Sequence, residues 1–342
     1  NYSGIFFTSN TTLNSGNGSI ELEGLSEGSG GDYGLYFSAG YSHYITSSNT
    51  TADAIQLTGD GFHGLDFRGT SMQIHATGDN GGITLTAKDT RYWGFTIYTD
   101  IEILAKSGPI SWVQEGDDPN YYSNGTDIWV GSKNGVTGLN TSSSNVNFKS
   151  SFKPDTTNAP YSPNFHIATN GNFSVRGIAG TGNFSKTLNS NEFSINENNT
   201  SINDFIFGST GNTSSININA SLQALGDIEI YGGTISISEP TSAVGSITTI
   251  ASTSIGISNN LTVTGSNANI YLKSSGQIDQ GGTNTTQTNG GSVVYWANSD
   301  GNTGNNNYIR SGKIITNGGH VWMGGSLNNN NTSTWNGLIV GS

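Results

Sequence analysis

Acidic and basic residues gather at two places in this chain of 342 residues. The first group combines two carboxylates with an imidazole and a guanidinium, in Asp60, His63, Asp66 and Arg68. The second group is acidic and contains Glu115, Asp117 and Asp118. Cleavage of a polysaccharide needs paired carboxylates, or carboxylates beside Arg or Lys, on one solvent-facing strip. These two groups are therefore the candidates for glycan-cleaving chemistry.

Asp66 belongs to a repeated element, which predicts the direction of its side chain. It lies in Gly64-Leu65-Asp66-Phe67, and Tyr36 and Thr96 hold the same position in the related elements. Alternate residues of a strand face opposite sides, so we expect Asp66 to point outward between two neutral side chains. A catalytic row would need a second carboxylate on a neighbouring coil. We therefore assign no catalytic residue and expect that the chain is not an enzyme.

The residue types also give little support for a metal or a cofactor. The histidines show no paired spacing and occur as His43, His63, His75, His166 and His320. Cysteine is absent, which excludes thiolate ligands and disulfides. The Asp-Gly-rich segment 300–305 lacks the alternating acids and terminal Glu of a calcium loop and favours a turn. We predict no metal site and no cofactor, with the histidines on the surface or in turns.

A repeat of about thirty residues organises positions 19–113. Gly34, Gly64 and Gly94 begin similar strand-like elements, and a second element repeats its isoleucine at 45, 74 and 103. A third element places two apolar residues around one other residue, as Ile20-Leu22, Ile55-Leu57, Ile83-Leu85 and Ile110-Trp112. Gly, Asn, Ser and Asp separate these elements. The pattern predicts an all-β solenoid with about three short strands per coil.

The repeat divides the chain into three stretches. Residues 1–136 are predicted to form solenoid coils with the thirty-residue period. Residues 137–170 hold three of the six prolines, and proline cannot donate to a central ladder, so we expect a loop or outer flap there. Residues 171–342 resume the strand pattern, with the clearest alternation at 226–278, and are predicted to continue the coils to an uncapped C-terminus.

The composition limits the partners of the chain. Only 32% of the residues are hydrophobic and 49 are glycine, which suits a narrow solenoid with a thin core. The net charge of −12 disfavours nucleic acid and anionic membranes, because both attract clustered Lys and Arg. No apolar run approaches the ~20 residues of a membrane span.

Three Asn-Gly-Gly corners and the strands near them carry a resemblance to a known family. The corners lie at 80–82, 289–291 and 317–319, beside Val293-Val294-Tyr295-Trp296 and Val321-Trp322-Met323, and a Gly-Asp-Ile-Glu-Ile strand lies at 226–230. With these features the sequence resembles the large repetitive β-solenoid adhesins of bacteria, the filamentous-haemagglutinin-like and autotransporter-passenger class. The resemblance implies a right-handed parallel β-helix, export to the cell surface, and a role in attachment or in extracellular fibres.

Repeated aromatic residues have two interpretations. Tyr33, His63 and Trp93 stand at one position of successive coils, where stacking between coils is the favoured role. The alternative is an exposed stripe that binds a carbohydrate or another surface ligand. Its candidate members are Tyr121, Tyr122, Trp129, Trp296 and Trp322.

These features together predict an extracellular structural and adhesive protein. Because the chain begins at Asn1 rather than Met, we expect a removed leader or a segment of a larger surface protein. Its partners would be adjoining solenoid segments or other copies, together with a glycan or the surface of a host or neighbouring cell. Leu338, Ile339 and Val340 are the candidate end-to-end contact. The alternative is a β-helix that binds or degrades polysaccharide.

Overall fold

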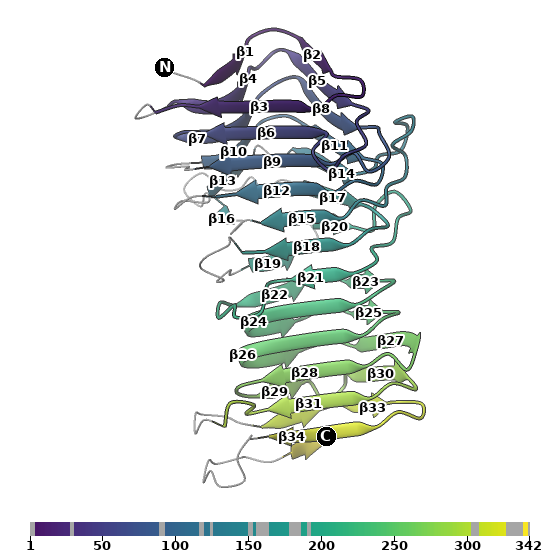
Figure 1. Ribbon diagram of the computed structural model, residues 1–342. Helices are drawn as coiled ribbons and strands as arrows, with labels where there is room; N and C mark the ends of the chain where they lie inside the picture. Colours follow the sequence, from purple (N-terminus) through teal and green to yellow (C-terminus); the bar gives the residue numbers. More distant parts are fainter. Residues whose placement is uncertain are drawn as a thin grey trace. The chain divides into compact units, whose positions relative to one another are not determined.

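The chain folds as a parallel β-helix, as predicted from the repeat (Figure 1). A computed structural model describes residues 4–27, 31–88, 93–115, 120–123, 126–149, 153–154, 164–177, 186–189, 193–301, 308–325 and 338–340. Within these ranges the elements are strands, and none is a helix. The chain forms two compact units. Unit 1 comprises Asn1–Ile178 with Asn191–Ser201, and unit 2 comprises Ala179–Ser190 with Ile202–Ser342.

Unit 1 has three parallel sheets, and each of its first six coils gives one strand to each sheet. Sheet A contains β1 (Ile5–Phe7), β4 (Tyr33–Phe37), β7 (His63–Phe67), β10 (Trp93–Ile97), β13 (Asn120–Ser123) and β16 (Lys153–Pro154). Sheet B contains β2 (Thr11–Asn14), β5 (Ser42–Ser47), β8 (Ser71–Ala76), β11 (Ile101–Ala105), β14 (Asp127–Gly131), β17 (Asn164–Ala168) and β20 (Phe193–Ile195). Sheet C contains β3 (Ile20–Leu25), β6 (Ile55–Asp60), β9 (Ile83–Lys88), β12 (Ile110–Gln114), β15 (Val146–Lys149) and β18 (Phe173–Arg176).

The strand register in unit 1 is the one that the repeat predicts. Leu35 lies opposite Leu65, and Leu65 lies opposite Phe95. The isoleucines at 45, 74 and 103 form a second row, and those at 55, 83 and 110 form a third. The interval 137–170 contains β15 and β17, which pair in parallel with strands on either side. Residues 150–152 and 155–163 of this interval lie outside the described residues.

Unit 2 also has three parallel sheets. Sheet D contains β21 (Phe205–Phe207), the first halves of β24 (Ile228–Ile237) and β26 (Ile247–Ile257), β28 (Ile270–Ser274), β31 (Val293–Ala297) and β34 (Val321–Gly325). Sheet E contains β19 (Lys186–Asn189), β22 (Ile216–Asn219), the second halves of β24 and β26, β29 (Ile278–Gln280), β32 (Ile309–Ser311) and β35 (Leu338–Val340). Sheet F contains β23 (Leu222–Ala224), β25 (Thr241–Ala243), β27 (Leu261–Ser266), β30 (Thr285–Asn289) and β33 (Lys313–Ile315).

Some coils of unit 2 are shorter, because β24 and β26 each turn a corner without a loop. The register between these two strands shifts from Gly232 to Thr234, where the chain passes from sheet D to sheet E. Ile228, Ile247 and Ile270 face one another on consecutive coils, and they stand closer together in the sequence than equivalent residues of unit 1 do. Similar side chains therefore stack in rows, and these isoleucines are fully buried in the narrow core.

A row of polar side chains supports one corner of unit 2. Each oxygen accepts a hydrogen bond from the backbone N–H of a residue on the next coil. Asp204 Oδ1 accepts from Asp227 N at 2.9 Å, and Asp227 Oδ1 accepts from Ser246 N at 2.6 Å. Ser246 and Asn269 extend the row to Ser292. The abundant Asn, Asp and Ser residues thus satisfy backbone donors that the ladders leave unpaired at the corners.

The Asn-Gly-Gly corner at 289–291 allows two coils to approach closely. Gly290 has a φ of 85°, and a Cβ at Gly291 would overlap the carbonyl oxygen of Ala268 on the preceding coil. We predict that Gly291→Ala lowers the free energy of unfolding of unit 2 by about 1–3 kcal/mol, measured by urea denaturation. Gly256→Ala is the matched control, because a Cβ there has its nearest neighbour at 4.0 Å. Equal stability of the two variants would contradict this packing.

Candidate functional site

Asp66 and Arg68 form a closed ion pair on sheet A. Arg68 donates to both carboxylate oxygens of Asp66, from Nε at 2.8 Å and from Nη2 at 3.0 Å. The Asp66 side chain is 0% exposed and that of Arg68 is 27% exposed. Burial raises the pKa of Asp66 to about 6, although Arg68 opposes that rise. Although its strand position predicts an outward direction, Asp66 is closed to solvent, because its charged partner and the aromatic rings around Arg68 cover it.

Aromatic rings surround the other side of this pair. The Arg68 guanidinium lies 4.6 Å from the Tyr98 ring centroid and 5.5 Å from that of Tyr33. Tyr33 stacks on His63 at 4.9 Å, which confirms stacking between coils for these two rings. Burial and the charge of Arg68 lower the pKa of His63 to about 4. The Asp66–Arg68 pair is therefore a packed structural element, and its carboxylate is closed to a substrate. Asp60, the other carboxylate of this group, is half-buried at the end of β6.

The second acidic group does not form a described site. Glu115 is exposed at the end of β12, where its N–H donates to the Ala87 carbonyl at 2.8 Å. Asp117 and Asp118 lie outside the described residues. Within the part of the chain that the structure describes, His, Asp and Glu side chains form no group of three able to hold a metal ion.

The expectation of surface histidines is wrong for three of the five. His43, His63 and His75 are buried, because a narrow coil places these rings against neighbouring strands or charged partners. His75 Nε2 lies 3.1 Å from Glu102 Oε2 on the next strand of sheet B. Lys133 Nζ donates to the other oxygen of Glu102 at 2.6 Å. The hydrogen bond with His75 and the ammonium of Lys133 lower the pKa of Glu102, against a smaller effect of burial, so this carboxylate is unsuited to donate a proton at neutral pH.

Trp129, which was predicted to belong to an exposed aromatic stripe, lies on sheet B beside Glu102 and Lys133. The register places Glu102 on one side of Trp129 and His166 on the other. The His166 ring stacks on the indole at 4.4 Å with an interplanar angle of 9°. Lys133 Nζ lies 5.6 Å from the centre of the same indole. Trp129 is therefore half-buried, with the His166 ring over one face of its indole and Lys133 nearby.

Trp296 and Trp322 come together on the outer face of sheet D. Their ring centroids are 6.3 Å apart at an angle of 88°. Trp322 is 48% exposed, whereas Trp296 is half-buried with Lys273 Nζ 4.6 Å from its ring centre. The side chains of the remaining predicted residues lie outside the described residues. These are Tyr121 and Tyr122 of the stripe, and Leu338, Ile339 and Val340 of the end-to-end contact.

The two tryptophans extend two rows of side chains that run across successive coils. One row contains Tyr231, Ile250, Lys273 and Trp296 at one register of sheet D. The adjacent row contains Glu229, Thr248, Tyr271, Val294 and Trp322. We call these two rows the aromatic face. The Tyr and Trp rings of these rows combine a large apolar area with a polar O–H or N–H group, as the rings of binding surfaces for polar ligands do.

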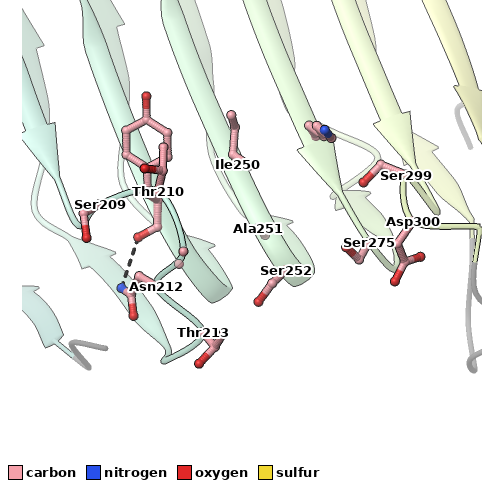
Figure 2. A pocket seen from close by; sticks show the side chains of 14 residues that line it. Ser209, Thr210, Asn212, Thr213, Ile250, Ala251, Ser252, Ser275, Ser299 and Asp300 are labelled. Carbon is pink, nitrogen blue, oxygen red and sulfur yellow. Dashed lines mark hydrogen bonds between the residues drawn. The ribbon is translucent and has the colours of Figure 1, made fainter. Parts of the chain in front are cut away.

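A groove of about 290 Å³ lies at the corner between sheets D and E and shares Tyr231, Ile250 and Lys273 with the aromatic face (Figure 2). Five consecutive coils line it, through residues 209–213, 231–232, 250–252, 273 with 275, and 299–300. Hydroxyl and amide groups predominate, and Lys273 and Asp300 are the charged lining residues. Figure 2 shows Asn212 held by a hydrogen bond from its amide to the Tyr231 carbonyl, at 3.2 Å.

This groove was not predicted from the sequence. Its lining residues lie in turns, at strand ends and at the corners within β24 and β26, and their alignment depends on coil lengths that vary along sheet D. One signal was present in the sequence. Ile250 faces outward, and Lys273 and Trp296 follow it at equal intervals along the chain, each at the same register of the next strand.

The fold places the chain in the class of parallel β-helix proteins. Comparisons of the chain with models of known families, with curated proteins and with solved structures found no match. Among the described residues, no helix is long and apolar enough to cross a membrane.

Proposed function

We propose that this chain is an extracellular structural and adhesive protein, a segment of a bacterial surface adhesin or fibre. The coils serve as a scaffold, and the aromatic face of unit 2 serves as the attachment surface. The observation that carries the proposal is the exposed Trp322 beside Trp296, on adjacent coils of one sheet face. Exposed aromatic residues grouped on one face are typical of binding surfaces rather than of inert ones.

An adhesive role accounts for the described charged groups better than an enzymatic one. Asp66 is fully buried against Arg68, and Glu102 is held by Lys133 and His75. Asp279 accepts two hydrogen bonds from Arg310, each at 2.6 Å. A glycan-cleaving site needs an accessible acid opposite a second carboxylate. These carboxylates instead bind cations of their own chain, as structural ion pairs do.

The adhesive role is tested by the retention of protein-coated beads on insoluble polysaccharide and on fixed bacterial and eukaryotic cells. On whichever of these surfaces retains beads coated with the wild-type protein, we expect beads coated with Trp322→Ser to be retained at least ten-fold less. The matched control is Phe6→Ser, because Phe6 is a similarly exposed aromatic residue of unit 1 at 51%. Retention that is absent on all surfaces, or equal for both variants, would refute an adhesive face in unit 2.

The structural role includes contact with an adjoining solenoid coil, from the same polypeptide or from another copy. Within the described residues β34 pairs with β31 alone, and Val321 is 50% exposed although its register partner Val293 is fully buried. A further coil would cover Val321 and extend the ladder. We predict that the sedimentation coefficient rises with concentration over the micromolar range. A single monomeric species at all concentrations would exclude association between copies.

A further inference from the structure

We propose that the groove between sheets D and E binds an extended neutral oligosaccharide lying along the stacking direction of the coils. This inference rests on the proposed adhesive function and names a ligand for the groove that borders the aromatic face of unit 2. It makes the groove a specific binding site, whereas the aromatic face alone would give only general adhesion.

The shape of the groove favours a chain-like ligand. The lining residues come from five consecutive coils, and at ~4.8 Å between neighbouring strands these coils span roughly 19 Å. The volume of about 290 Å³ is near the lower end of small-molecule sites. A long and shallow site of this kind fits several linked sugar rings better than one compact molecule.

The chemistry of the lining favours a polyol. Ser209, Thr210, Thr213, Ser252, Ser275 and Ser299 supply hydroxyl groups from both sides of the groove (Figure 2). A hydroxyl both donates and accepts hydrogen bonds, which matches the hydroxyl groups of a sugar. Ile250 adds a half-buried apolar side chain to the lining, beside the buried Ala251 and Gly232, and this side chain suits the C–H face of a pyranose ring.

The charges of the groove favour a neutral sugar over an acidic one. Lys273 is the single cation of the lining, and its ammonium already lies 4.6 Å from the Trp296 ring centre. Asp300 adds a negative charge at one end of the groove, so the two charged lining residues cancel. A polyuronate or sulfated glycan would find no cluster of Arg or Lys in the groove to neutralise its charges.

The proposal is tested with the full chain and soluble hexasaccharides. The neutral probes are cellohexaose, laminarihexaose, maltohexaose and mannohexaose, and the acidic probe is hexagalacturonate, each titrated calorimetrically. We expect at least one neutral hexasaccharide to bind, with an affinity that increases from disaccharide to tetrasaccharide and then levels off. Failure of all four neutral probes to bind at millimolar concentration, or tighter binding of hexagalacturonate, would overturn the proposal.

Variants locate the binding and separate it from the aromatic face. Ser252→Trp and Thr210→Trp fill the groove from two different coils and should each weaken binding at least ten-fold. Thr264→Trp is the control, because Thr264 is exposed on β27 of sheet F and does not line the groove. Circular dichroism checks that each variant is folded, and the two groove variants provide independent readings. Binding that both groove variants leave intact would overturn the proposal.

The outcome is distinguishable from a failure of the proposed adhesive function. Bead retention depends on Trp322, whereas oligosaccharide binding depends on the groove. If the beads are not retained but the oligosaccharide still binds, the adhesive face is refuted and the groove remains the oligosaccharide site. Retention without binding of any neutral hexasaccharide would refute the groove and leave the adhesive face.

Discussion

Replacing Phe148 with alanine should lower the free energy of unfolding of unit 1 by about 3–5 kcal/mol, as expected for a buried Phe→Ala change. Phe148 is 1% exposed and lies at the centre of the aromatic core. Its ring centroid is 5.2 Å from that of Phe165 and 5.9 Å from those of Trp112, Phe173 and Phe193. These partners lie on several strands of sheets B and C, so one truncation weakens contacts between successive coils.

Chemical denaturation with Trp fluorescence and circular dichroism measures this effect. In a solenoid, stability is approximately a sum of coil and nearest-neighbour terms, so the loss should appear in unit 1 while the transition of unit 2 changes little. Phe6→Ala is the control, because Phe6 is 51% exposed and stacks only on Tyr36 among the described rings, at 4.5 Å. We expect that control to cost about 1 kcal/mol or less. A similar loss for both variants would contradict the assignment of Phe148 to the core.

Replacing Arg68 with methionine should destabilise unit 1 by about 3–5 kcal/mol at pH 7.5, because it leaves the buried Asp66 carboxylate without its partner. Asp66 is 0% exposed and accepts both hydrogen bonds described above from Arg68. The variant also loses the contact of the guanidinium with the Tyr98 ring. Methionine keeps much of the apolar stem, so the expected loss reflects mainly the unpaired charge.

The loss of stability caused by Arg68→Met should be smaller in acid than at pH 7.5. The direction of this change follows from the pKa of Asp66. Its folded-state pKa of about 6 lies above the ordinary value of 3.8, because burial outweighs the effect of Arg68. As the pH falls through 6, Asp66 binds a proton in the folded protein before it does so in the unfolded chain. Protonation of Asp66 therefore stabilises the folded state increasingly until about pH 4, where the unfolded chain also binds the proton. A shift of this size corresponds to roughly 3 kcal/mol. Without Arg68 the pKa of Asp66 rises further, and the proton then removes the unpaired charge.

Unfolding free energies at pH 7.5 and 4.5 test this prediction. The deficit of Arg68→Met relative to wild type should fall by at least half between these two pH values. The double variant Asp66→Asn with Arg68→Met carries neither charge at this site, so its stability should lack the pH dependence of this group. A deficit for Arg68→Met that is the same at both pH values would show that the carboxylate is not the group responsible.

The repeat in the sequence was sufficient to predict the class of fold and the register of unit 1. Leu35, Leu65 and Phe95 occupy one row, as the glycine spacing requires. The signal is strong because a narrow core accepts apolar side chains only at alternate positions, and a parallel ladder repeats them in register. The Asn-Gly-Gly corners were also predicted, and Asn80 at a φ of 64° and Gly290 at 85° have the positive values that tight corners use.

The surroundings of charged side chains could not be predicted in the same way. Alternation assigns Asp66 to the outside of its strand, but it does not show that Arg68, two residues later, folds back over it. Tyr295 illustrates the same limit inside unit 2. Its hydroxyl lies fully buried beside Thr286 and Gln280, within 2.6 Å and 2.9 Å respectively. Such contacts depend on which coils become neighbours and on the length of each turn, neither of which a local pattern encodes.

The candidate surfaces were predicted only in part. Trp296 and Trp322 were identified from two similar strands that each follow an Asn-Gly-Gly corner, and the structure brings them together. Trp129 belongs instead to a packed polar surface of unit 1. The groove escaped prediction because serine and threonine in turns are too common in this chain to mark a site.

Hydroxyl-radical footprinting of the protein while it is attached to the surface that retains it tests the central claim most directly. The account predicts that attachment reduces the oxidation of Trp322 strongly and that of Trp296 measurably, while Phe6 and Trp129 in unit 1 remain as reactive as in the free protein. Protection confined to unit 1, or no change at Trp322, would contradict the assignment of the aromatic face as the attachment surface.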